Sequence, residues 1–180
     1  MYQRALFVGR FQPFHLGHLE AVRRILKEAR ELVIVIGSAE KSHELDNPFT
    51  AGERMEMIGL ALKGAGIQPA AYALVPVPDA AAHTIWVSQL VAYAPKFEVV
   101  YSNQALTRRL LIESGYEVKE IPLVKRAEYS ATEIRKRILA GEHWANLVQK
   151  EIYEFIKRTK GDERMQDIAK SDKKGGEPPA

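Results

Sequence analysis

A short apolar run near the N-terminus leads into a turn that is rich in glycine and polar residues. Ala5 to Val8 has the composition of a buried strand, and the segment from Gly9 to His18 (GRFQPFHLGH) follows it directly. An amphipathic stretch begins at Leu19. The order therefore predicts a strand, a glycine turn and a helix.

This turn has the residues expected of a phosphate site. A helix start presents free N–H groups and partial positive charge to an anion. Gly9 lets the backbone approach closely, and Arg10 can place a guanidinium on phosphate oxygens. The imidazoles of His15 and His18 can donate to an oxygen that gains charge. The alternative is that the histidines only cap the helix and that Phe11 is ordinary core.

Short apolar segments alternate with helical patterns along the rest of the chain. Strands are expected at 5–8, 32–36, 73–77, 97–101 and 117–122, and helices at about 16–30, 51–64, 84–94, 104–114, 131–140 and 144–158. Such alternation predicts right-handed βαβ units. The expected fold class is α/β: a Rossmann-like, doubly wound, mainly parallel sheet with helices on both faces and a helical C-terminal part.

One domain is expected over residues 1–160, because a chain of 180 residues suits a single core. From Gly161 onward Asp, Lys, Gly and Pro dominate, which predicts a polar, mobile tail over 161–180. Within it, Met165 to Ala169 can form a short docking turn.

Composition excludes several classes of protein. The chain has no cysteine, so disulfides, thiolate nucleophiles and cysteine-based zinc sites are excluded. No apolar run approaches the roughly 18 residues of a membrane helix, and the first strand starts too early for a signal peptide, so we expect a cytoplasmic protein. The net charge is +3, and the basic residues are interspersed with acidic ones rather than gathered in a stripe. This distribution argues against nucleic-acid binding.

Four segments follow strands directly: 9–18, 37–47, 78–83 and 102–104. In a doubly wound sheet, ligands bind beyond the carboxyl ends of the strands, where the strand order switches. We therefore expect these segments to share one rim and to form the binding site.

A second candidate phosphate element opens the penultimate helix. Ser130 and Glu133 have the spacing of a capping box, which satisfies free N–H groups without any ligand. The alternative is functional, since the hydroxyls of Ser130 and Thr132, with Arg135 one turn later, can hold terminal phosphates of a nucleotide.

Together the two elements resemble the nucleotidylyltransferase superfamily, which carries His/Thr-x-Gly-His early and Ser-x-Thr-x-x-Arg late. Here these motifs are His15 to His18 (HLGH) and Ser130 to Arg135 (SATEIR). The fuller forms GRFQPFH from Gly9, GSA from Gly37 and NPFTAGER from Asn47 resemble the archaeal-type nicotinamide-nucleotide adenylyltransferases, as do the Trp-Val pair at Trp86 and the Tyr-Ser-Asn run that ends at 103.

The resemblance implies that ATP and nicotinamide mononucleotide (NMN) give NAD and pyrophosphate. The acceptor's 5′-phosphate attacks the α-phosphorus of ATP, and no protein nucleophile is needed. Mg²⁺ is implied between the phosphates, held largely by substrate and water because no cluster of His, Asp and Glu has the spacing of a protein metal site. Similar enzymes form homo-oligomers, often hexamers, which we expect here by analogy.

Residue roles follow from the same resemblance. The implied catalytic groups are the side chains of His15, His18, Arg10 and Arg135, with His18 nearest the α-phosphate. The implied ATP-binding residues are Gly9, Arg10, Phe11, His15, His18, Ser130, Thr132 and Arg135.

The acceptor side is less constrained. Trp86 is the expected stacking partner of the nicotinamide ring, although apolar neighbours at helical spacing also fit a core position. Asp79 is expected to bond ribose or carboxamide, and Ser38 and Asn103 are expected to line the pocket because they follow strands. His83 has no partner pattern and is expected on the surface or as a cap.

Two alternatives stay open. The same chemistry can act on nicotinate mononucleotide, flavin mononucleotide or pantetheine phosphate, and the fold can also serve as a non-catalytic nucleotide-binding protein. The loop before Asn47 adds a difficulty, because it carries Glu44 and Asp46 where a basic residue would suit an acceptor phosphate; His43 or Lys41 are the candidates to compensate.

Overall fold

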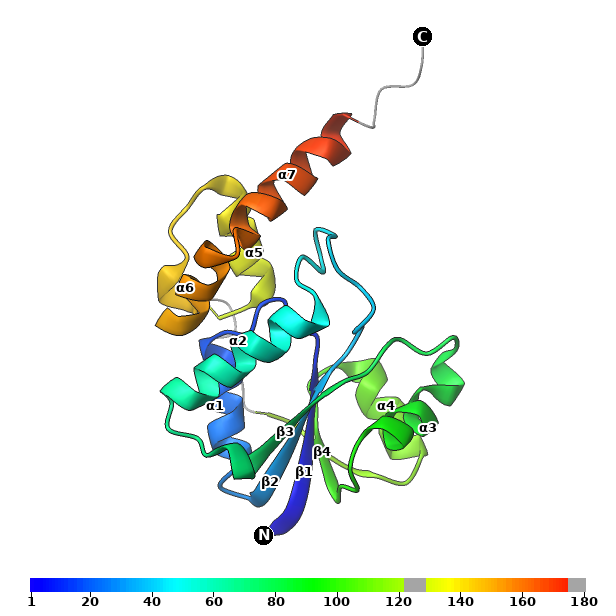
Figure 1. Ribbon diagram of the computed structural model, residues 1–180. Coiled ribbons are helices and arrows are strands. Elements are labelled where there is room, and N and C mark those ends of the chain that lie inside the picture. The colour runs from blue at the N-terminus through cyan, green and yellow to red at the C-terminus, as the bar shows by residue number, and fades with distance from the viewer. Residues whose placement is uncertain (122–128, 175–180) are drawn as a thin grey trace.

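The computed structural model of the protein describes residues 1–121 and 129–174 (Figure 1). Its centre is a five-stranded sheet with the strand order β3-β2-β1-β4-β5. Every pair of neighbouring strands is parallel. The expected α/β class with a parallel, doubly wound sheet is confirmed.

The elements follow one another as alternating strands and helices until the C-terminal part, which is helical. In chain order they are β1 (Tyr2–Gly9), α1 (Leu16–Ile25), β2 (Ala29–Ile36), α2 (Ala51–Gly64), the 3-10 turn η1 (Pro69–Ala71), β3 (Tyr72–Pro76), α3 (His83–Tyr93), β4 (Val99–Tyr101), α4 (Ala105–Glu113), β5 (Glu117–Lys119), α5 (Ala131–Ala140), the 3-10 turn η2 (Ala145–Leu147), α6 (Lys150–Arg158) and α7 (Gly161–Lys174).

Strand order reverses at β1, which pairs with β2 on one side and β4 on the other. Gly9 lies opposite Ile36 and Phe7 lies opposite Tyr101, so all three strands end at the same edge of the sheet. In this topology the crevice between β1 and β4 is where a ligand binds. The fold therefore places the two loops after β1 and β4 next to each other.

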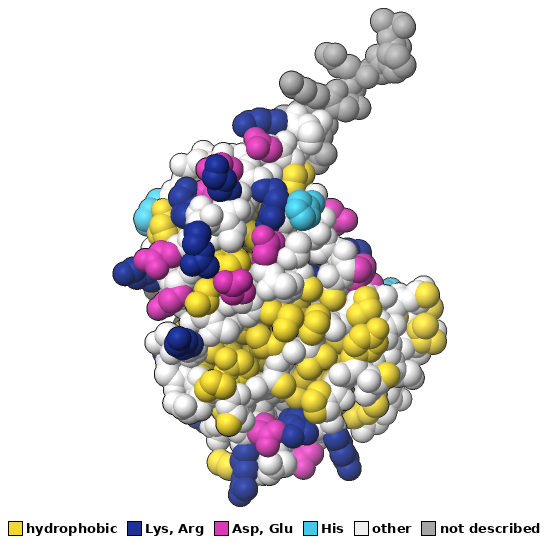
Figure 2. Space-filling model, in the orientation of Figure 1, with side chains coloured by type: hydrophobic (Ala, Val, Ile, Leu, Met, Phe, Trp, Pro, Cys, Tyr) yellow, Lys and Arg dark blue, Asp and Glu magenta, His cyan; other side chains and the backbone are white. Residues whose placement is uncertain are grey.

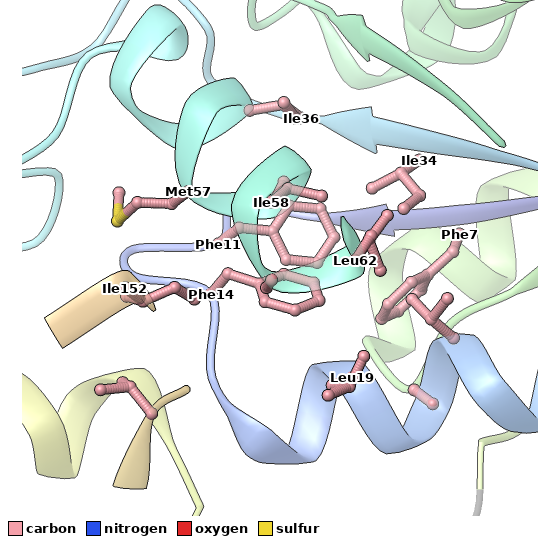
Figure 3. Packing of buried hydrophobic residues seen from close by; sticks show 14 of the residues in the cluster. Phe7, Phe11, Phe14, Leu19, Ile34, Ile36, Met57, Ile58, Leu62 and Ile152 are labelled. Atoms are coloured by element: carbon pink, nitrogen blue, oxygen red, sulfur yellow. The ribbon is translucent and has the colours of Figure 1, made fainter. Parts of the chain in front are cut away.

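Helices cover both faces of the sheet, with α1 and α2 on one side and α3 and α4 on the other (Figure 1). Side chains alternate along β1, so that Phe7 belongs to the larger hydrophobic cluster and Leu6 to the smaller one. Phe7, Phe11 and Phe14 pack with Leu19 of α1 and Met57 of α2 in the larger cluster (Figure 3). The glycine turn is therefore anchored by aromatic side chains in the core.

Two boundaries differ from the sequence prediction. Helix α1 ends at Ile25 rather than near residue 30, because the chain turns at Leu26 and β2 already starts at Ala29. β2 is paired with β1 from its first residue: the Tyr2 amide donates to the Glu28 carbonyl at 2.8 Å, and Tyr2 lies opposite Ala29 in the sheet. β5 ends at Lys119, and the rest of the expected strand reaches residue 122, which lies outside the described residues.

The C-terminal part needs a correction. The chain from Gly161 was expected to be mobile, but residues up to Lys174 form α7. Met165 is fully buried in the larger cluster, Arg164 binds both oxygens of Glu53 at 2.9 and 2.8 Å, and Gln166 Nε2 donates to the Ile138 carbonyl. The buried methionine and these polar contacts together anchor the helix to the rest of the chain. Residues 175–180 lie outside the described residues.

The predicted helix over 144–158 is interrupted. Leu147 of the turn η2 and Trp144, which precedes the turn, are both buried, and α6 begins only at Lys150. None of the described helices is long and apolar enough to cross a membrane.

Candidate active site

A cavity of about 780 Å³ opens at the carboxyl ends of β1 and β4. Its wall comes from four loops after strands and from the start of α5, as the sequence predicted for a single rim. The wall includes every residue to which the sequence assigned a site role: Gly9, Arg10, Phe11, His15, His18, Ser38, Asp79, Trp86, Asn103, Ser130, Thr132 and Arg135.

The turn after β1 is packed so closely that Gly9 has no room for a side chain. A Cβ on Gly9 would lie 2.7 Å from the ring of Phe11. Phe11 itself is buried and has a positive φ of 54°, an uncommon backbone conformation for a residue other than glycine. The turn therefore brings backbone directly against the cavity, as close approach to a phosphate requires.

His15 and His18 stack on each other at the start of α1. Their ring centroids are 3.6 Å apart with an interplanar angle of 25°. The His15 amide donates to His18 Nδ1 at 3.3 Å, so a neutral His18 ring carries its proton on Nε2. Nδ1 of His15 is buried without a partner among the described residues.

Both imidazoles are held in the neutral form. Burial lowers the pKa of His15 to about 4. Burial, with a smaller contribution from His15, also holds the pKa of His18 well below its usual range. At neutral pH each ring can therefore donate one N–H without carrying charge of its own.

Arg135 joins the late motif to the early one. Its guanidinium is 7% exposed and donates to the Gln12 carbonyl at 3.0 Å, across 123 positions of sequence. A second nitrogen binds Asp46 Oδ1 at 2.9 Å, although Asp46 is largely exposed. Burial lowers the pKa of Arg135, and Asp46 opposes that shift. The acidic loop that looked unfavourable in the sequence thus supplies a counter-ion to Arg135.

The start of α5 fits both interpretations of its sequence. Ser130 Oγ accepts a hydrogen bond from the Glu133 amide at 3.1 Å, which is an N-cap. Ser130 and Thr132 also line the cavity, and Thr132 is exposed to it. The cap and a phosphate-binding role are therefore compatible in one position.

On the part of the wall that follows β2 and β3, polar groups bond to one another. Ser38 Oγ donates to Asp79 Oδ1 at 2.9 Å, and Lys41 Nζ lies 2.7 Å from Asp79 Oδ2. Partial burial acts to raise the pKa of Asp79, but the Lys41 and Ser38 hydrogen bonds outweigh it and the pKa is lowered. Lys41 therefore balances the negative charge of Asp79 in the cavity wall.

Trp86 and His83 lie one turn apart on α3, and both face the cavity. Trp86 is half-buried and also packs on the smaller hydrophobic cluster, so the core and stacking interpretations both hold in part. Asn103 lines the cavity, but its amide donates to the Ile121 carbonyl at 2.8 Å and accepts from the Ile121 amide at 2.9 Å. Its side chain therefore fixes a loop.

Sequence reasoning missed two supporting residues, Gln12 and Arg54. The Gln12 side chain donates to the Phe49 carbonyl at 2.9 Å and accepts from the Phe49 amide at 3.0 Å, which ties the turn after β1 to the start of α2. Arg54 is 0% exposed and binds carbonyls of the loops after β1 and β2. A charged residue inside the apolar face of α2 was the available signal.

Residues 1–121 and 129–174 contain no group of three His, Asp or Glu side chains that could hold a metal ion. Within that part of the chain, Asp79 is the one carboxylate of the cavity wall, and it is already bonded to Lys41 and Ser38. The wall presents donors for anions and little that would bind a cation directly.

Comparison with known proteins agrees with this geometry. The chain is 48% identical over 171 residues to a nicotinamide-nucleotide adenylyltransferase of Methanolobus tindarius, with 95% of this chain and 97% of the relative covered. It is 43% identical over 170 residues to a protein of the same name from Saccharolobus solfataricus, covering 94% and 99%. These relatives confirm the resemblance to the archaeal-type enzymes that the motifs predicted.

A solved structure shares the fold. It is a bifunctional NMN adenylyltransferase/ADP ribose pyrophosphatase from Francisella tularensis, with a TM-score of 0.83 and 24% identity over 96% of this chain and 54% of that one. The same protein has been solved in complex with AMP and a manganese ion. A family model described as cytidylyltransferase-like matches residues 6–137. The chain therefore belongs to the cytidylyltransferase-like family.

Proposed function

We propose that this protein is a nicotinamide-nucleotide adenylyltransferase, which joins ATP and NMN to give NAD and pyrophosphate. In this reaction an oxygen of the NMN 5′-phosphate attacks the α-phosphorus of ATP. The bond from the α-phosphorus to the bridging oxygen breaks, and pyrophosphate leaves with that oxygen. The high identity to relatives of this name over nearly their full length supports the assignment.

One structural observation carries the proposal: the early and late motifs meet. Arg135 of α5 donates to the Gln12 carbonyl at 3.0 Å, and residues of both segments line the same cavity. Its volume of about 780 Å³ is within the range typical of small-molecule sites. A triphosphate lying between the start of α1 and the start of α5 would meet donors from both.

The donor side fits stabilisation of phosphate charge. His18 would offer Nε2–H to the α-phosphate, with His15 beside it. Ser130, Thr132 and Arg135 would hold the β- and γ-phosphates and then the leaving pyrophosphate. Gly9 would allow close approach. The Arg10 side chain is exposed, and its one hydrogen bond within the described residues is a 3.4 Å contact to Asn47, so it would be free to turn onto the phosphates.

Alignment and charge stabilisation suffice for this chemistry. Holding two reactants in line can lower a barrier by about 7–11 kcal/mol. A single donor aimed at the developing charge is typically equivalent to about 10²–10³-fold in rate. Neutral histidines suit this role, because each supplies an N–H without requiring a proton to be taken up first.

On the acceptor side, Trp86 would stack on the nicotinamide ring. Ser38 and Asp79 would bond the ribose or the carboxamide, and Asn103 would shape the wall through its bonds to Ile121. We propose Mg²⁺ as the cation, which would be held mainly by substrate phosphates and water, because Asp79, the one carboxylate of the wall among the described residues, is already bonded to Lys41 and Ser38. When bound it would neutralise phosphate charge, and the anion donors of the wall would act beside it.

We also propose that the protein is a cytoplasmic homo-oligomer, with a hexamer as the expected form, and that it binds neither nucleic acid nor membrane. Apolar side chains gather over the sheet-bearing part of the face in Figure 2, whereas charged side chains gather on the helical C-terminal part. Ile85, Val91 and Tyr93 of α3 are among the exposed large hydrophobic residues. Contiguous exposed apolar surface is typical of protein–protein contacts.

The test is the release of pyrophosphate from ATP by the purified protein with Mg²⁺, coupled to chromatographic detection of the dinucleotide. NMN is compared with nicotinate mononucleotide, flavin mononucleotide and pantetheine phosphate at equal concentration. We expect NAD formation with NMN as the best acceptor. Faster turnover of another acceptor would reassign the substrate, and turnover of none would leave a nucleotide-binding protein.

A further inference from the structure

Arg54 is a fully buried cation next to the cavity. It lies on α2 with 0% of its surface exposed, and no carboxylate within the described residues forms an ion pair with it. Burial lowers its pKa to about 10, so it is still charged at neutral pH. A buried charge without a counter-ion is costly unless its donors are fully used. What Arg54 binds therefore indicates why it is there.

All four hydrogen bonds that the Arg54 guanidinium forms with the described residues go to main-chain carbonyls. Nε donates to Thr50 at 3.2 Å, at the start of its own helix. Nη1 donates both to the Arg10 carbonyl at 3.0 Å and to the Gly37 carbonyl at 2.8 Å, and Nη2 donates to the Ser38 carbonyl at 3.1 Å. One guanidinium thus joins the loop after β1 to the loop after β2.

The two peptides that share Nη1 each precede a residue with positive φ. Phe11 has a φ of 54° and Ser38 a φ of 48°. Such a conformation costs a residue other than glycine about 1–2 kcal/mol. Backbone held in this way persists only when its surroundings determine it. Arg54 is the group that contacts both peptides.

Fixing these carbonyls also fixes the direction of two amides. In a trans peptide the N–H points away from the C=O. The amides of Phe11 and Ser38 therefore point away from Arg54, and both residues line the cavity. Within residues 1–121 and 129–174 neither amide donates a hydrogen bond to the protein. Two free donors are thus set on two different loops of the wall.

We propose that Arg54 is a positioning residue that orients the Phe11 amide toward the triphosphate and the Ser38 amide toward the acceptor nucleotide. Arg54 itself touches neither substrate. The proposal rests on the adenylyltransferase function given above and extends it, because one buried side chain then sets the geometry of both substrate sides. The guanidinium is required for its shape, since an ammonium cannot span the same three carbonyls.

The central variant is Arg54→Lys, which keeps the charge and removes the fork; Arg54→Gln is the second variant. Arg164→Lys is the matched control, because Arg164 binds Glu53 of the same helix and reaches the loop after β2 only at the Phe49 ring, with no hydrogen bond to the Arg10, Gly37 or Ser38 carbonyls. Each variant is checked by circular dichroism and assayed below its own Tm. We expect kcat/KM to fall about 10- to 100-fold for both substrates in the Arg54 variants, and to stay near wild type in the control.

A second substitution separates positioning from general loosening. Glycine adopts positive φ freely, so the effect of Arg54→Lys is compared in the wild type and in Ser38→Gly, which by itself lacks the Ser38 hydroxyl. In the Ser38→Gly background, Arg54→Lys is expected to raise the KM for NMN by a smaller factor than in the wild type, and to raise the KM for ATP by the same factor. Two results would overturn the proposal: wild-type kcat/KM in both Arg54 variants, or a loss of the same size in Arg164→Lys.

A binding readout keeps this test independent of turnover. In protein labelled with ¹⁵N-phenylalanine, which has six such residues, the Phe11 amide resonance is expected to shift on adding ATP. The shift should be lost in Arg54→Lys and kept in Arg164→Lys. If the wild type bound ATP but made no NAD, the proposed function would fail while this comparison still decided the role of Arg54; an unchanged shift in Arg54→Lys would refute it.

Discussion

The two sides of the cavity are built in different ways. On the ATP side, His15 and Arg135 are buried and are fixed by contacts with the glycine turn. On the acceptor side, Asp79 is exposed and bonded to another exposed side chain, and Trp86 is half-buried. The comparison indicates that the proposed ATP side consists of preorganised groups, whereas the proposed acceptor side combines the fixed main chain at Ser38 with side chains that can adjust.

Substitution of His18 removes a donor from the preorganised side of the cavity and should have the largest effect on activity. His18→Ala removes the Nε2–H donor, so kcat/KM for ATP is expected to fall about 10²–10³-fold with the KM for NMN little changed. His143→Ala is the control, because His143 is exposed and outside the cavity wall. Steady-state pyrophosphate release measures both, and normal turnover in His18→Ala would contradict the assigned mechanism.

The buried His15 should also make the fold sensitive to acid. Its pKa of about 4 lies below the usual 6.5, so between these values the unfolded chain takes up a proton that the folded chain does not. Its contribution to stability is therefore complete above pH 6.5 and is lost as pH falls toward 4, by about 3 kcal/mol in total. Urea unfolding at a series of pH values measures it. In His15→Asn the free energy of unfolding should change less steeply with pH over this range. A slope equal to that of the wild type would refute the lowered pKa of His15.

Trp86→Ala alters the adjustable side and should act on one substrate only. Loss of a stacked ring is expected to raise the KM for NMN about tenfold, or about 1.4 kcal/mol, and to leave the KM for ATP unchanged. Trp86→Phe retains a ring and should restore most of the affinity. Equal rises in both KM values would instead assign Trp86 to packing of α3.

The smallest expected effect concerns Ser130, and it distinguishes an N-cap from a residue that also binds ATP. Ser130→Ala and Thr50→Ala each remove an N-cap hydroxyl and should each lower the free energy of unfolding by about 1 kcal/mol. Thr50 is not part of the cavity wall, so only Ser130→Ala is expected to raise the KM for ATP, by about five- to tenfold. An equal KM for ATP in the two variants would show that Ser130 acts only as an N-cap.

Much of the fold and the membership of the wall followed from local patterns. The strand–turn–helix order around Gly9 and the spacing of Ser130 and Arg135 are short-range signals, and parallel strands bring their carboxyl ends together whatever lies between them. That rule is why residues over a hundred positions apart were expected in one cavity, where the structure places them. Their chemical roles stay predictions.

What the sequence could not supply depends on contacts distant along the chain. The carbonyls that Arg54 binds belong to two other loops. Because every residue has a main-chain carbonyl, the sequence does not indicate which of them accept these hydrogen bonds. The positive φ of Phe11 and Ser38 has the same origin. Helix α7 was missed because its anchoring depends on Met165 and on Arg164 with Glu53, while its remaining residues have the composition of a disordered tail.

The bond between Arg135 and the Gln12 carbonyl has a consequence for biosynthesis. During translation the glycine turn is synthesised well before its arginine partner, since 123 positions separate Gln12 from Arg135. A nascent polypeptide can thus pair β1 with β2 long before Arg135 is available to complete the cavity. Under the proposed function, ATP would stabilise only chains that extend past Arg135, and a product truncated before that residue would gain no such protection.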